Sequence, residues 1–495
     1  MAKRRTMRTG AGAAVAVVAL SAAMAVPPGA ALAAEVPRYA VADDAEPVRG
    51  TESSAEGPAL EPGLYTDRIG PGETRFYSVT LDDSSTVYLS ATAAPKPGAE
   101  VASYGEELTL RLETTDGQEC DTGGSAGFHN NGSAYPVSSY AGRRVGGGID
   151  VCQEAGPYLF SVSRTSPETS DQADWPVEIG YFAEPGLTGS VPGPPPAPDD
   201  EEEAPTPPSG PAEQARGGTS FNDAGAIGTG VWKDRLHAGE SRFYRVPVDW
   251  GQRLSARLEL PNTALAEDAS TGYLSDGFGL QVYNPVRGQL HDEGFASYRG
   301  KQTATELLTA PVDYGRRFAD EGRGSSMAGW WYVQVTLHQD LAAFFPDGAP
   351  VTLRTVVAGE AKEPPAYDGD AVAAGFGVTD EDREAAAEGL TAAEVADRAA
   401  KRRIGVMGVG TGTVLVAGLA VWWLLARRRA VPAPAGPGTL TAPMEPGGYG
   451  YPQQGAGLPG PTPPGQERGD GFGPSPSAFG PAPGGWPPEG NRPQR

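Results

Sequence analysis

Three acidic side chains lie close together in one short stretch of the chain and could bind a cation. Asp116, Glu119 and Asp121 flank a Gly-Gln pair, as expected in a turn between two strands. Calcium prefers several carboxylate and carbonyl oxygens on a flexible loop, so these residues are candidate calcium ligands. Their spacing is not that of an EF-hand, and acidic turns are also common on solvated hairpins. No other cofactor is predicted.

A possible nucleophile is Ser125, which lies in the sequence Gly-Gly-Ser-Ala-Gly. This sequence has the form of the G-x-S-x-G nucleophile elbow, in which a strand-to-helix turn exposes the serine oxygen beside an oxyanion hole. No helix is predicted after Ser125, so a flexible loop is the favoured interpretation, although His129 is near in sequence. The four histidines form no H-E-x-x-H zinc motif. The sequence therefore predicts no enzyme, and a hydrolase with an unrecognised site is kept as an alternative.

Arginine pairs occur in both halves of the chain, as Arg143-Arg144 and Arg316-Arg317. A guanidinium fork can bind a carboxylate of a ligand or stack on an aromatic ring, so these residues are candidate ligand-binding residues. The favoured alternative is a structural ion pair with Asp67 or Glu73 and with their counterparts.

Adjacent tryptophans, Trp330 and Trp331, are the other candidates for ligand binding. Their rings could stack on sugars. Burial in a protein core is the favoured alternative, because aromatic side chains contribute large buried areas.

Most of these residues belong to blocks that occur twice in the same order. The block at 63–79 contains Gly-x-x-x-Asp-Arg, a Pro-Gly-Glu turn and Arg-Phe-Tyr-x-Val, and it returns at 230–246 with an Ala-Gly-Glu turn. A match of this length indicates a duplicated domain. The further matching blocks are 136–144 with 311–317, 155–162 with 328–335, and 175–179 with 349–353.

Each copy is predicted to be an antiparallel β-sandwich, so the fold class of the ectodomain is all-β. Its segments are short, rich in β-branched and aromatic residues, and separated by Gly, Pro, Asp and Ser. Several of them alternate apolar with polar residues, which is typical of a strand with one buried face. The predicted strands of the first copy are 75–81, 86–91, 108–113, 158–163 and 177–181.

The repeated blocks resemble the opening and closing strands of bacterial pre-peptidase C-terminal domains. The resemblance covers both copies, about half of the chain, and rests on the Pro-Gly-Glu turn, the Arg-Phe-Tyr strand and the later Ala-Gly-x-Tyr strand at 155–158. It implies an accessory β-sandwich that binds polymers or neighbouring domains. One departure is the absence of the Asp-rich segment that follows the middle strand in that family.

The ends of the chain predict export and a single membrane span. A basic start followed by an apolar run and small residues is typical of a secretory signal peptide. A second apolar run, flanked by basic residues, is long enough to cross a hydrocarbon core of about 30 Å. The predicted organisation is a signal peptide (1–33), a loose leader (34–55), sandwich 1 (56–184), a Pro-rich acidic linker (185–216), sandwich 2 (217–360), a stalk with a helix (361–403), a transmembrane helix (404–426) and a disordered Pro/Gly-rich tail (427–495).

Charge and cysteine content restrict the partners. The net charge of −23 argues against nucleic acid, because phosphates are bound by Lys and Arg. Cys120 and Cys152 are the two cysteines, and export favours a disulfide between them that stabilises the first copy by roughly 3 kcal/mol.

These patterns predict a non-enzymatic surface protein of the cell envelope, in the type I single-pass orientation. The ectodomain is expected outside, where it binds a wall polymer or a protein partner, and the tail in the cytoplasm. Residue usage is typical of a bacterium with a GC-rich genome, such as an actinobacterium. The first alternative is a transmembrane sensor or scaffold whose Pro-rich tail recruits cytoplasmic proteins.

Overall fold

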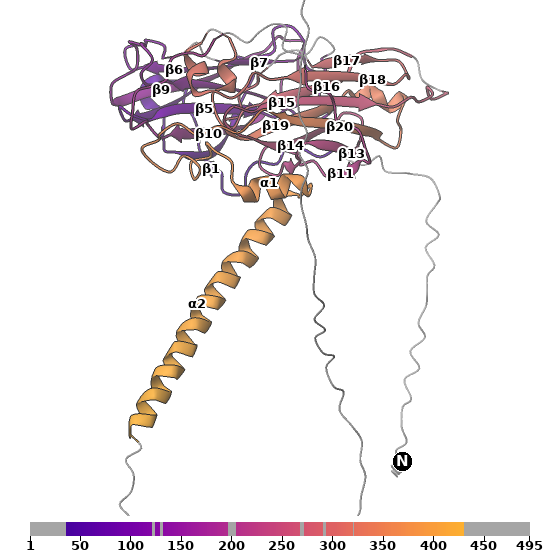
Figure 1. The fold of residues 1–495 in the computed structure, drawn as a ribbon. Helices are drawn as coiled ribbons and strands as arrows, with labels where there is room; N and C mark the ends of the chain where they lie inside the picture. Colours follow the sequence, from indigo (N-terminus) through magenta and orange to yellow (C-terminus); the bar gives the residue numbers. More distant parts are fainter. Residues whose placement is uncertain are drawn as a thin grey trace, which may run out of the picture. The chain divides into compact units, whose positions relative to one another are not determined.

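The computed structural model describes residues 36–120, 124–128, 132–196, 204–267, 272–290, 294–319 and 321–429. Four five-stranded sheets form two β-sandwiches, one from each repeat, so the predicted tandem sandwich fold is confirmed (Figure 1). The predicted signal peptide and nearly all of the predicted tail lie outside the described residues.

Repeat 1 combines the sheet β1-β3-β10-β5-β8, called sheet A, with the sheet β2-β4-β9-β6-β7, called sheet B. All five predicted strands are present and extend further than expected. The strands are β1 Glu46–Pro47, β2 Ala59–Leu60, β3 Gly63–Ile69, β4 Thr74–Leu81, β5 Thr86–Ala93, β6 Glu107–Thr114, β7 Ser125–Gly127, β8 Val137–Arg143, β9 Gly156–Thr165 and β10 Trp175–Glu184.

Repeat 2 has the same topology, with sheet E (β11-β13-β20-β15-β18) in the place of sheet A and sheet F (β12-β14-β19-β16-β17) in the place of sheet B. The duplication read from the sequence is therefore also a duplication in three dimensions. The strands are β11 Glu213–Gln214, β12 Gly225–Ala226, β13 Gly230–Leu236, β14 Ser241–Val248, β15 Arg253–Leu260, β16 Leu274–Tyr283, β17 Phe295–Tyr298, β18 Thr303–Leu308, β19 Gly329–Leu337 and β20 Ala349–Ala358.

Strand alternation builds the core of each sandwich. In β9, Tyr158, Phe160 and Val162 are buried in the core of repeat 1. The equivalent strand β19 buries Trp331 and Val333 in the core of repeat 2. Each such side chain contributes about 1.5–3 kcal/mol by leaving water, so these two cores are what hold the strands together.

One pair of matching blocks does not correspond in space. Residues 137–143 form β8, which pairs with β5 at the edge of sheet A. The matching residues of repeat 2 form a short 3-10 helix, η2 Tyr314–Phe318, and β18 takes the place of β8 beside β15. The expected equivalence of these two blocks is therefore wrong.

The segment predicted as a loose leader is packed against the protein. β1 pairs in parallel with β3 at the edge of sheet A, and Tyr39 packs edge-on against Phe221 and Phe243 of repeat 2. The linker behaves similarly at both ends, because Leu187 forms a β-bridge with Tyr367 and β11 joins sheet E. The sandwiches also contact each other directly, through the ion pairs Arg287–Glu178 and Arg317–Glu184.

The stalk contains two helices, where the sequence predicts one. α1 Asp380–Ala387 begins at a capping box formed by Thr379 and Asp382. The chain then adopts a left-handed conformation at Gly389 (φ 65°), and Thr391 and Glu394 repeat the same capping interactions at the start of α2 Ala392–Arg429. A second cap straight after a glycine that ends the first helix explains why the helix is interrupted.

Two further predictions concern α2 and the cysteines. α2 includes the residues predicted to span a membrane, yet none of the helices formed by described residues has an apolar stretch long enough to cross one. The predicted span therefore stays a prediction. Cys120 and Cys152 form a disulfide, as predicted.

Candidate functional site

The repeated Asp-Arg motif forms the same hydrogen-bond network in both sandwiches. The Oδ2 atom of Asp67 accepts hydrogen bonds from the Tyr77 hydroxyl (2.8 Å) and the Gly50 backbone N–H (2.7 Å). In repeat 2, Asp234 Oδ2 accepts from the Tyr244 hydroxyl (2.8 Å) and a glycine N–H (3.0 Å). These contacts tie the segment before each sandwich to its third and fourth strands. The motif therefore holds the same strands together in both copies.

Electrostatics of this network keep both tyrosines neutral. Burial, together with the neighbouring Asp67, raises the pKa of Tyr77 well above its usual value. Burial and Asp234 do the same for Tyr244. A neutral hydroxyl can donate to the carboxylate, so these groups are suited to structure and not to proton transfer near neutral pH.

Arg143 and Arg317 pair with other carboxylates than those that the sequence suggested. Arg143 approaches Asp82 instead, with 3.7 Å between Arg143 Nη2 and Asp82 Oδ1. Glu73, one of the expected partners, pairs with Arg75 (2.7 Å). The expectation of an ion pair from Arg143 to Asp67 or Glu73 is wrong, because β10 and β5 lie between β8 and β3 in sheet A, and Glu73 follows β3 in the turn to β4.

Arg317 joins the two repeats. Its guanidinium donates to both carboxylate oxygens of Glu184 in β10, at 2.6 and 2.9 Å, and both side chains are buried. The hydroxyls of Tyr88 (3.1 Å) and Tyr367 (2.5 Å) also donate to this carboxylate. Burial alone would lower the pKa of Arg317, but Glu184 outweighs it and the pKa is raised. Arg317 is therefore charged and unavailable to an external ligand.

A second buried ion pair crosses the same surface. Arg287 of repeat 2 donates to Glu178 Oε2 at 2.6 Å, and the exposed fractions of the two side chains are 6% and 0%. Glu178 also accepts from the Tyr39 hydroxyl (2.6 Å), the Ala42 N–H (2.8 Å) and the Asn222 side chain (2.9 Å). One carboxylate of sheet A thus fixes the N-terminal segment and repeat 2 together.

The other ligand-binding candidates also have structural contacts. Arg144 donates to the backbone carbonyl of Arg317, and Arg316 is buried and donates to the Pro311 carbonyl (2.8 Å). Trp331 is fully buried in the core of repeat 2. Trp330 is half-buried, with the Arg245 guanidinium 4.4 Å from its ring centre.

The acidic turn is open to solvent in its described part. The Asp116 carboxylate accepts from the Thr114 hydroxyl (2.5 Å), and Glu119 pairs with Arg111 (3.1 Å). Asp121 lies outside the described residues. Over the described residues, no group of three or more His, Cys, Asp or Glu side chains is placed to hold a metal ion. The calcium site stays a prediction.

Ser125 lies in β7, a short edge strand, and its side chain is exposed. β7 pairs with β6, and the next described residues continue as coil up to Phe128. A nucleophile elbow requires a helix directly after the serine. The candidate partner His129 lies outside the described residues.

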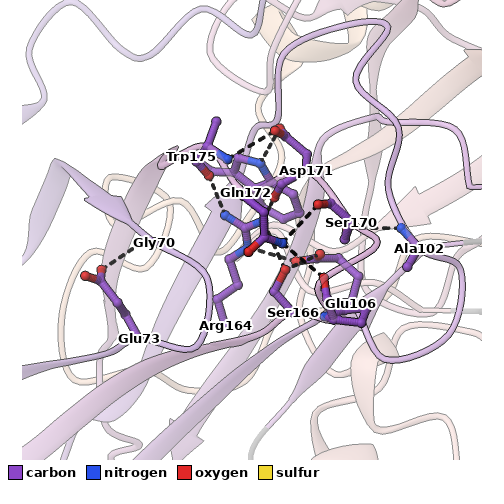
Figure 2. Close-up of polar contacts among 12 residues, drawn as sticks. Gly70, Glu73, Ala102, Glu106, Arg164, Ser166, Ser170, Asp171, Gln172 and Trp175 are labelled. Atoms are coloured by element: carbon purple, nitrogen blue, oxygen red, sulfur yellow. Dashed lines mark hydrogen bonds and ion pairs between the residues drawn. The ribbon is translucent and has the colours of Figure 1, made fainter.

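A polar network that the sequence did not suggest lies at one end of sandwich 1 (Figure 2). Arg164 donates to Glu106 Oε1 (2.8 Å), both side chains are fully buried, and the guanidinium lies 3.4 Å from the ring centre of Trp175. Arg164 also binds the Ala173 carbonyl (2.7 Å), and Trp175 Nε1 donates to Asp171 (3.0 Å). The network closes the loop between β9 and β10. Its one sequence signal is an arginine at an inward-facing position of an alternating strand.

Comparisons with known proteins give no family. No family model matches the chain, and no curated protein matches it. Among solved structures, it resembles the tandem CBM51 modules of a family 98 glycoside hydrolase from Streptococcus pneumoniae, with 10% identity over 60% of this chain and 83% of that chain, at a TM-score of 0.15. The CBM22-1-CBM22-2 tandem domain of Paenibacillus barcinonensis Xyn10C has 11% identity over 63% of this chain and 96% of that chain, at a TM-score of 0.17. The CUB1-EGF-CUB2 domain of human MASP-1/3 has 7% identity over 59% of this chain and 99% of that chain, at a TM-score of 0.14. TM-scores this low support no statement about function.

Proposed function

We propose that this chain is a non-enzymatic surface protein of the cell envelope, whose paired sandwiches bind a wall polymer or a protein partner. It would be a type I single-pass membrane protein, with the sandwiches outside, the predicted 404–426 span in the membrane and the tail in the cytoplasm. The acidic charge, the disulfide and the predicted signal peptide support this location.

The observation that carries the proposal is the joining of the two sandwiches by buried charges. Glu184–Arg317 and Glu178–Arg287 are both inter-repeat pairs inside one packed unit. A fixed pair of sandwiches presents its outer surfaces in one arrangement, so a large ligand can bind both without first ordering them. Loosely tethered sandwiches would lack this advantage.

A sedimentation experiment tests the proposal. Full-length protein in mild detergent is mixed with isolated cell-wall sacculi and centrifuged, with and without added calcium. We expect the protein to pellet with the wall. Protein that stays in the supernatant, with no partner crosslinked in intact cells, would contradict the proposal. Pelleting that requires calcium would identify the acidic turn at Asp116 and Glu119 as a site, and Asp116→Asn with Glu119→Gln should then abolish it.

A further inference from the structure

Each sandwich has a hollow at the same place, beside its repeated Asp-Arg motif. The hollow of repeat 1 is lined by Thr66, Arg68 and Pro176, among others, and that of repeat 2 by Lys233, Arg235 and Pro350. Part of each lining corresponds, because Arg68 faces Pro176 across β3 and β10 as Arg235 faces Pro350 across β13 and β20. Both hollows have a volume of about 480 Å³. The duplication has therefore kept a surface feature as well as a fold.

The two arginines are positioned in the same way. Arg68 Nη2 donates to the Asp174 carbonyl (2.6 Å), and Arg235 Nη1 donates to the Gly348 carbonyl (2.9 Å). The backbone N–H of each arginine donates to the preceding aspartate at 2.7 Å. A guanidinium has five N–H donors, so each arginine is oriented by one contact and keeps others for an anion. Both side chains are exposed.

A second cation lies at each hollow. Arg49 in repeat 1 and Lys233 in repeat 2 are exposed, and their side chains form no ion pair or hydrogen bond with another residue that the structure describes. Two acidic groups line the second hollow: Glu259, which is paired with Arg257 (3.1 Å) and Arg354 (2.9 Å), and Asp234, which accepts hydrogen bonds from Tyr244 and a backbone N–H. The first hollow is lined by a third arginine, Arg75, which is paired with Glu73 (2.7 Å), and by two carboxylates, the hydrogen-bonded Asp67 and the exposed Asp174.

These cations stand out because the chain has a net charge of −23, which repels anions in general. We propose that the two hollows bind anionic groups, phosphate or carboxylate, carried at intervals along one repeating polyanion. Arginine binds both groups through two parallel N–H bonds. Two sites in one packed unit should bind such a polymer more tightly than either site alone, since binding at the first site raises the effective concentration of the polymer's other anionic groups at the second. This inference rests on the proposed function and names the chemistry of its ligand.

Binding of two defined polymers to the full-length protein tests the inference. Long-chain inorganic polyphosphate carries phosphates, polygalacturonate carries carboxylates, and dextran is the uncharged control. We expect binding to one or both polyanions but not to dextran, and weaker binding as salt is added. Arg68→Gln with Arg235→Gln should weaken binding about tenfold or more, and each single variant should weaken it less, because one site remains.

Two further variants separate site binding from general charge. Arg49→Gln with Lys233→Gln removes the second cations without removing a described contact, so it should weaken binding without lowering the melting temperature. The matched control, Lys96→Gln with Lys362→Gln, removes two exposed positive charges elsewhere and should change affinity less than about twofold.

Equal losses in the control and site variants would overturn the inference, as would a loss confined to one hollow or binding of neither polyanion. Sedimentation with sacculi that the site variants do not change would overturn it and leave the proposed function standing. Polyanion binding without sedimentation would support the hollows and refute wall binding.

Discussion

The two repeats fill the same buried position with side chains of opposite character, one charged and one apolar. At the end of β9, repeat 1 buries Arg164 against Glu106 and Trp175. At the equivalent position of β19, repeat 2 buries Leu337, and Ala349 takes the place of Trp175. The backbone is the same in both, since the N–H of Arg164 donates to the carbonyl of the glutamate before β4 (2.9 Å) and that of Leu337 to its counterpart (3.0 Å). The fold therefore requires only that this position be filled, and either a paired charge or a leucine can fill it.

The equivalent faces of sheets A and E also differ. The outer face of sheet A holds Glu178 and Glu184, which are buried by contacts with repeat 2. The outer face of sheet E holds Arg257 and Arg354, half-exposed and paired with Glu259. One face has become an interface and the other has stayed on the surface, so duplication gave two domains with the same topology and different partners.

Changing Glu184 should have the largest effect. Glu184→Gln leaves Arg317 buried without a full counter-charge, which we expect to cost about 3–5 kcal/mol and to uncouple the repeats. Urea unfolding of the full chain should then show two transitions. Glu119→Gln, the same change in an exposed pair, should cost less than about 1 kcal/mol. Equal midpoints for both variants would show that the buried pair does not join the repeats.

Exchanging the chemistry at the end of β9 tests the first comparison directly. Arg164→Leu places the residue of repeat 2 in repeat 1 but leaves the carboxylate of Glu106 buried without a counter-charge, so we expect a loss of about 3 kcal/mol in the free energy of unfolding. Adding Glu106→Leu removes the unpaired charge and should recover most of that loss. The idea fails if the single variant is as stable as the double variant.

The network shared by both repeats should respond equally in each. Asp67→Asn and Asp234→Asn each weaken an acceptor that holds a buried tyrosine hydroxyl and a backbone N–H, at an expected cost of about 1–3 kcal/mol per repeat. Unfolding curves of the two variants provide the measurement, with Asp174→Asn, an exposed site, as the control. A cost in one repeat alone would show that the motif is not equivalent in the two.

Raising the pH should have the smallest effect on the stability of the fold. Burial, helped by Glu61 and Asp82, raises the pKa of Tyr181 in repeat 1 to about 12, and burial raises that of Tyr298 in repeat 2 to about 12. The pKa of a tyrosine in the unfolded chain is about 10. The stability that each neutral, buried tyrosine contributes to the folded state is therefore complete below pH 10 and is lost as the pH rises towards 12. Tyrosinate absorbance during a pH titration should show both groups, and Tyr181→Phe or Tyr298→Phe should remove one of them. Ionisation of either near pH 10 would refute the effect of burial.

Local patterns were enough to predict the strands and the duplication. The alternation of apolar and polar residues around Phe160 and the repeated Arg-Phe-Tyr sequence are both visible within a few neighbouring residues. The structure confirms the strands at both places. The disulfide was predictable because Cys120 and Cys152 have no competing partner.

The long-range polar contacts could not be predicted, because they form only when the two repeats pack against each other. Arg317 and Glu184 are 133 residues apart, and nothing in either segment identifies the other. Similarity alone misled at 311–317, where matching residues form a 3-10 helix in place of a strand. Glu178 and Glu184 lie at outward-facing positions of β10, and contacts with repeat 2 bury them.

The contacts of Glu178 set an order of events during synthesis. Its partner Arg287 is made 109 residues later, whereas Tyr39 is made long before it. Once β10 has been synthesised, the first sandwich can close, but its outer face is then still exposed to water and Tyr39 lacks its packing partners Phe221 and Phe243. The residues around Tyr39 are therefore among the last to be fixed, and a nascent chain halted between the repeats should be easily cut there by a protease.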